Sequence, residues 1–143
     1  MSKRILSVLM ILSILVAAIP ALPASAETRT SEYLTDCYAQ LSPGSGSGEL
    51  KLTYQVTTGK TGIVRIGIVA LFVYRPDGTI AGVVSYNASN GLIKSGVTNV
   101  RSTYTIRDLD PGQTYYCSVR FLVEDAYGSD TQYYSTNTAV TPR

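Results

Sequence analysis

The chain has 143 residues, of which twelve are basic and ten acidic, and it contains neither histidine nor tryptophan. The absence of histidine excludes Ser-His-Asp and Cys-His catalysis and the usual zinc and haem ligand sets. Once Lys3 and Arg4 of the leader described next are set aside, basic and acidic residues are equal in number. A neutral domain offers no basic surface for nucleic acid or anionic lipid, so we expect neither as a partner.

The first 26 residues have the pattern of a secretory signal peptide. A basic start is followed by the apolar run 5–19, two prolines and the small-residue exit Ala24-Ser25-Ala26, which together predict a helical leader cleaved after Ala26. The alternative is an uncleaved membrane anchor, but the run is shorter than the roughly 20 residues that a spanning helix needs. We therefore expect a secreted domain, residues 27–143, without stable membrane insertion.

The remainder consists of short extended segments separated by turn residues, which is typical of a sandwich or barrel. Residues 42–48 and 58–62 are rich in Gly, Ser and Thr, and residues 87–96 are polar and contain glycine, so all three are expected to be loops. No helix is expected after the leader. Seven strands are predicted, at residues 33–41, 49–57, 63–74, 80–86, 100–106, 114–125 and 132–141.

A turn signal precedes the sixth predicted strand. Pro111 fixes φ for a turn, and Gly112 tolerates the unusual dihedral angles that follow. Tyr115 comes just past this corner and two residues before Cys117, which is the local pattern of the tyrosine corner in Greek-key sandwiches. Leu109, Pro111, Gly112 and Tyr115 are therefore predicted to form a structural corner.

Residues 104–142 resemble a fibronectin type III domain. The resemblance rests on a strand leading to Leu109, the Pro-Gly corner, Tyr115 opening the next strand, Gly128 in the following turn and a closing Val-Thr-Pro. It implies an all-β, immunoglobulin-like fold: a seven-stranded antiparallel Greek-key β-sandwich. The tryptophan usual on the second strand of such domains is missing, and Tyr54 is expected to take its place in the core.

Two cysteines, Cys37 and Cys117, lie eighty positions apart. An even count in an exported chain favours a disulfide, and closing that loop stabilises a fold by roughly 4–5 kcal/mol in the chain-entropy model. The alternative is a pair of free buried thiols.

The third predicted strand, residues 63–74, is apolar on both faces. One face of it carries residues 66, 68, 70, 72 and 74, and is expected to be the inner face. The opposite face should be polar if it meets solvent, and its apolar character predicts a site for a partner. The alternative is that a loop, residues 91–93, folds over it. The candidate partner face consists of Val69, Leu71, Val73, Tyr116 and Leu122.

These observations predict a secreted, non-enzymatic protein-interaction or adhesion-type module without cofactor or metal. The acidic residues fall at opposite ends of the sixth strand, so no shared calcium site is expected. The partner is another extracellular protein or a surface glycan, and self-association stays open. The alternative is a carbohydrate- or cell-wall-binding module that uses exposed tyrosines, which number eleven in the chain.

Overall fold

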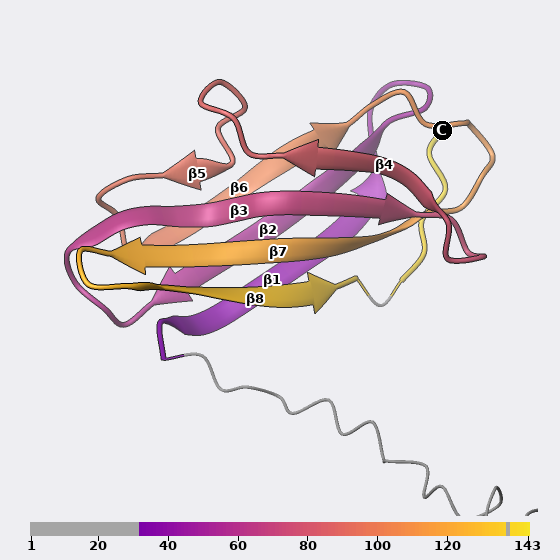
Figure 1. Cartoon of the computed structure of the whole chain (residues 1–143). Coiled ribbons are helices and arrows are strands. Elements are labelled where there is room, and N and C mark those ends of the chain that lie inside the picture. Colours follow the sequence, from indigo (N-terminus) through magenta and orange to yellow (C-terminus); the bar gives the residue numbers. More distant parts are fainter. Residues whose placement is uncertain (1–31, 137) are drawn as a thin grey trace, which may run out of the picture.

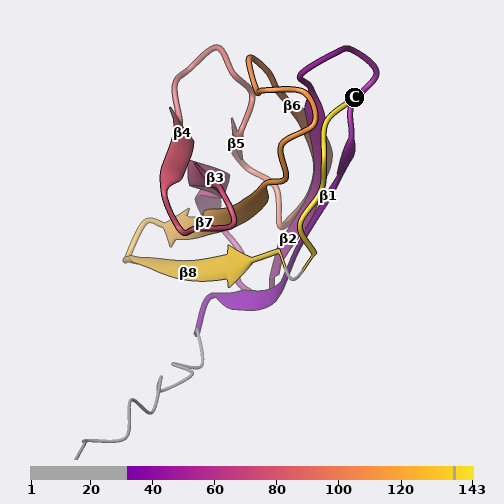
Figure 2. The ribbon, with the colours of Figure 1, turned by 90° about the vertical axis from the view of Figure 1, so that its right-hand side faces the viewer.

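The computed structural model describes residues 32–136 and 138–143, and the predicted signal peptide lies outside these residues. Within them the fold is all-β, with two antiparallel sheets packed face to face (Figures 1 and 2). No helical segment of residues 32–136 and 138–143 has the length and hydropathy of a membrane span. The strands are β1 (Leu34–Pro43), β2 (Leu50–Thr58), β3 (Ile63–Tyr74), β4 (Ile80–Ser85), β5 (Ile93–Lys94), β6 (Asn99–Ile106), β7 (Tyr116–Asp125) and β8 (Ser129–Ser135).

The three-stranded sheet, called sheet A, has the order β1-β2-β6, and the five-stranded sheet, called sheet B, has the order β4-β3-β7-β8 with β5 also paired to β3. Alternation in the sequence fixes which side of each strand is buried. In β2, Leu50, Leu52, Tyr54 and Val56 point into the core and are almost completely inaccessible to solvent. Tyr54 is 1% exposed and its ring lies 6.4 Å from that of Phe121 on the other sheet, so it occupies the core as predicted.

The structure contains eight strands in its described part, whereas seven were predicted. The additional strand, β5, arises within the predicted loop 87–96, where Ile93 and Lys94 pair with Gly67 and Ile66 of β3. The last strand is also shorter than predicted, because β8 ends at Ser135. Val140 then returns as an isolated bridge to Tyr115, so the predicted strand 132–141 is two separate pairings.

A β-bulge in β3 reverses the predicted orientation of its second half. The register between β3 and β7 shifts between Ile68 and Ala70, which leaves Val69 as an extra residue and inverts the alternation beyond it. Ile66 and Ile68 face the core as predicted, but after the bulge Leu71 and Val73 face it as well. The prediction that Leu71 and Val73 lie on the outer face is therefore wrong, and residues 70, 72 and 74 take their place.

The predicted disulfide is not formed, and both cysteines are free thiols. Cys37 lies on β1 and Cys117 on β7, in opposite sheets. Cys37 is half-buried and Cys117 is fully buried. The alternative of two free thiols therefore describes the fold.

Candidate interaction face

The outer face of sheet B carries a row of aromatic side chains at its centre. Because of the bulge, Phe72 and Tyr74 of β3 point outward, and Tyr74 pairs with Tyr116 of β7. The rings of Tyr74 and Tyr116 are stacked, with centroids 5.2 Å apart and an angle of 15° between their planes. The Phe72 ring lies 6.5 Å from that of Tyr74. All three side chains are half-buried, so their ring faces are partly covered by one another and partly open to solvent.

One cation, Arg120, lies beside this aromatic row. It pairs with Ala70 of β3 on one side and with Tyr133 of β8 on the other. The Arg120 guanidinium carbon lies 5.7 Å from the centre of the Tyr133 ring, a cation–π contact. Its Nε is buried and has no hydrogen-bond partner, and Arg120 forms no ion pair with any residue of the described chain. A guanidinium without an ion-pair partner can donate to an anionic group through its terminal nitrogens.

Exposed apolar residues extend the face toward its edges. Val83 of β4 is opposite Phe72 and is 52% exposed, while Tyr133 on β8 is 59% exposed. Ile80, opposite Tyr74, is also exposed. We call the whole set the sheet B face, and it comprises Phe72, Tyr74, Ile80, Val83, Tyr116, Arg120 and Tyr133.

The candidate partner face predicted from sequence coincides with this face at one central residue, Tyr116. Leu122 points outward as expected but is only 7% exposed, and Val69 is the bulge residue. The alternative of a covering loop is not what the structure shows, because residues 93–94 extend the edge of β3 beside Ile66 and Gly67. Phe72 and Tyr74 were missed because a bulge leaves no clear signal in a strand that is apolar on both faces. Arg120 lies on the same side of β7 as Tyr116 and Leu122, so alternation could have found it, and Tyr133 of β8 is its cross-strand neighbour.

The corner after β6 supports the fold next to this face. The Tyr115 hydroxyl accepts a hydrogen bond from the Asp110 N–H at 3.1 Å, and Leu109 is buried against the core. The Leu109 N–H donates to the Gly48 carbonyl at 3.1 Å. The corner is thus attached both to β7 and to the loop between β1 and β2.

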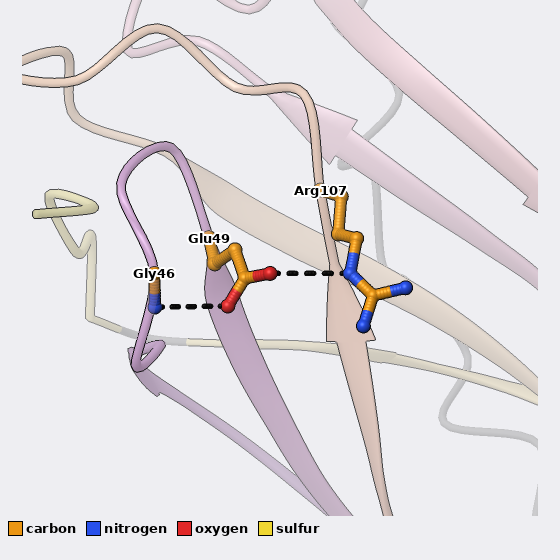
Figure 3. A network of polar contacts seen from close by, with 3 residues as sticks. All are labelled: Gly46, Glu49 and Arg107. Carbon is orange, nitrogen blue, oxygen red and sulfur yellow. Dashed lines mark hydrogen bonds and ion pairs between the residues drawn. The ribbon is translucent and has the colours of Figure 1, made fainter.

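A polar network on the surface strengthens the same attachment (Figure 3). One carboxylate oxygen of Glu49 accepts from the Gly46 N–H at 2.9 Å, and the other accepts from Nε of Arg107 at 3.1 Å. The Arg107 side chain is largely exposed, so the ion pair itself contributes little to stability. Its effect is to orient the loop that receives Leu109.

The described residues hold no cluster of three or more His, Cys, Asp or Glu side chains arranged to bind a metal ion. No protein-family model, curated protein or solved structure matches the chain.

Proposed function

We propose that the protein is a secreted, non-enzymatic interaction module with a fibronectin type III-like sandwich. The order of the strands supports the architecture. The chain crosses between the sheets after β2, after β5 and after β6, which matches the Greek-key connections of such domains. The hydrogen bond between Tyr115 and Asp110 adds the tyrosine corner. Secretion is supported by the leader pattern of residues 1–26.

The single observation that carries the binding role is the composition of the sheet B face. Aromatic residues and arginine are enriched where proteins bind one another, and they contribute most of the binding energy there. The sheet B face combines four aromatic rings with Arg120, whose guanidinium has no carboxylate partner among the described residues. We infer that an extracellular protein docks there and supplies an acidic side chain to Arg120.

The experiment is a screen of the purified protein against an array of extracellular proteins and a glycan array, followed by variants. Tyr133→Ala and Arg120→Ala should each weaken binding of a captured protein by roughly tenfold or more. The matched control is Tyr127→Ala, because Tyr127 is 96% exposed but lies in the turn between β7 and β8. Binding unchanged in both face variants would show that the sheet B face is not the docking surface.

A carbohydrate- or cell-wall-binding module is the second candidate, and the stacked pair Tyr74–Tyr116 favours it. Flat aromatic surfaces on a sheet pack against the apolar faces of sugar rings. Binding to glycans and to no protein, lost in Tyr116→Ala and Tyr133→Ala, would support this candidate against the first.

A further inference from the structure

The free edge of β6 presents unpaired backbone groups along most of its length. The Thr58 N–H donates to the Thr98 carbonyl at 3.0 Å, and Val56 pairs with Val100 two residues further on. Since backbone groups alternate in direction along a strand, the even-numbered residues of β6 bond to β2 and the odd-numbered ones point away. No backbone hydrogen bond is formed within the described chain by the outward residues Asn99, Arg101, Thr103 and Thr105.

On two other edge strands a side chain bonds to one backbone group, and in the described chain no side chain does so on β6. On β4, the Asn90 side-chain amide donates to the Ser85 carbonyl at 2.9 Å. On β8, the Asp130 carboxylate accepts from the Thr131 N–H at 2.8 Å. Proteins commonly protect exposed edges with charged side chains, with proline or with bulges. β6 carries one charged residue, Arg101, but it contains no proline and its register with β2 is continuous over the whole strand, so this edge is regular and unpaired.

Hollows lie along both halves of this edge. One, of about 310 Å³, is lined by Lys94, Ser95, Val97 and the first half of β6, residues 99–102. The other, of about 350 Å³, lies between β4 and the end of β6 and includes Val73, Tyr104 and Leu109 in its lining. Figure 2 shows β4, β5 and β6 on the same side of the sandwich. An extended chain beside β6 therefore has space for side chains that point inward.

The charges beside this edge are mainly positive. Lys94 and Arg101 are exposed and form no ion pair among residues 32–136 and 138–143. Arg107, after the end of β6, is paired with Glu49, and Asp108 lines the hollow beside β4. The hollow beside the first half of β6 is lined by Lys94 and Arg101 and by no acidic residue. An acidic peptide would therefore be favoured over a basic one.

We propose that the edge of β6 binds an extended acidic segment of another protein by strand addition. The backbone of the segment pairs with Asn99, Arg101, Thr103 and Thr105, its acidic side chains lie near Lys94 and Arg101, and its apolar side chains enter the hollows. This site adjoins the sheet B face at Val83, which also lines the hollow between β4 and β6, but it shares none of the aromatic residues or Arg120.

The test uses a fluorescent peptide of alternating valine and glutamate, with a peptide of alternating valine and lysine for comparison. Anisotropy should show that the purified protein binds the acidic peptide at least about tenfold more tightly. Hydrogen exchange followed by NMR should show slower exchange of the Arg101, Thr103 and Thr105 amides when the acidic peptide is bound. Binding of the peptide at another surface would not slow the exchange of these three amides.

Two pairs of variants separate backbone pairing from charge. Thr103→Pro removes an N–H that the fold does not use, and it should abolish peptide binding, whereas Thr103→Val should bind like the wild type. Arg101→Glu should weaken binding by about tenfold or more, whereas the same charge change at the remote turn, Lys60→Glu, should not. Tyr133→Ala, on the sheet B face, should also leave peptide binding unchanged.

Equal binding of both peptides, or binding that survives both Thr103→Pro and Arg101→Glu, would overturn the proposal. Protection of the Arg101, Thr103 and Thr105 amides in the free protein that increases with protein concentration would also overturn it, because the edge would then be occupied by a second copy of the chain. If Thr103→Pro unfolds the protein, the Arg101→Glu pair and the exchange of wild-type amides still decide the question.

Discussion

The Tyr115 side chain, buried at the start of β7, accepts a hydrogen bond from the backbone N–H of Asp110 through its hydroxyl, at 3.1 Å. Two further backbone bonds join Tyr115 to Val140. One residue therefore fixes the corner that leads from sheet A to sheet B and also holds the C-terminal segment. Its contribution can be measured by removing the hydroxyl alone.

Tyr115→Phe should lower the free energy of unfolding by about 1–2 kcal/mol, because the Asp110 N–H then loses its partner. Urea denaturation of the wild type and the variant measures the change. Tyr116→Phe, next to it but on the outer face, is the control and should change stability by less than about 0.5 kcal/mol. If both variants lower the free energy of unfolding equally, the hydrogen bond between Tyr115 and Asp110 does not stabilise the fold.

Gly48→Ala should destabilise the fold more strongly than Gly112→Ala. Both glycines have positive φ, 69° and 82°, so each substitution carries the strain of a left-handed residue, about 1 kcal/mol. At Gly48 a Cβ would also lie 2.4 Å from the Leu109 carbonyl oxygen, whereas at Gly112 it would meet no atom within 4 Å. Thermal melting should therefore show the larger fall in Tm for Gly48→Ala. If Tm falls equally in both variants, the Leu109 carbonyl oxygen does not lie as close to Gly48 as in this structure.

Leu71 and Phe72 are neighbours in sequence but face opposite sides of sheet B. Leu71→Ala should cost about 2–5 kcal/mol, because it leaves a cavity in the core. Phe72→Ala should cost about 1 kcal/mol, since its ring is half-buried on the outer face and no core cavity forms. Chemical denaturation of the two variants tests the bulge at Val69 directly. A larger loss at Phe72 would restore the alternation predicted from sequence.

The two free thiols should make stability fall in alkali. Burial raises the pKa of Cys117 from its ordinary value of 9.0 to about 12, and burial together with the nearby Asp36 does the same for Cys37. Between pH 9 and about pH 12 the thiol loses its proton in the unfolded chain but keeps it in the folded state. The free energy of unfolding therefore declines as pH rises above 9. For Cys117 the decline is up to about 1.4 kcal/mol per pH unit.

Cys117→Val isolates this effect from the titration of the tyrosines, because both proteins contain the same tyrosines. The difference in unfolding free energy between wild type and variant should be constant below pH 9 and should change above it. In the folded wild type, alkylation of both cysteines at neutral pH should be slow, and denaturant should accelerate it strongly. Rapid alkylation of Cys117 without denaturant would contradict its burial.

The sequence by itself determined the strand content and the corner. Alternation within the strands and turn residues between them predicted where the strands lie. The predicted ends of β3 are the observed ones, and the ends of most other strands agree within two residues. Local chemistry was sufficient there, because alternation and turn residues act over a few neighbouring positions. The place of Tyr54 in the core followed from the same pattern.

The tertiary structure alone decided which side of β3 is buried, where the two cysteines lie and how residues 93–94 are used. Both faces of β3 are apolar, so its residue pattern does not distinguish two registers, and the bulge at Val69 is set by pairing with β7. Cys37 and Cys117 lie in opposite sheets, so their separation depends on how one sheet lies over the other. Pairings between distant segments fix these features, and such pairings leave no periodic signal in the chain.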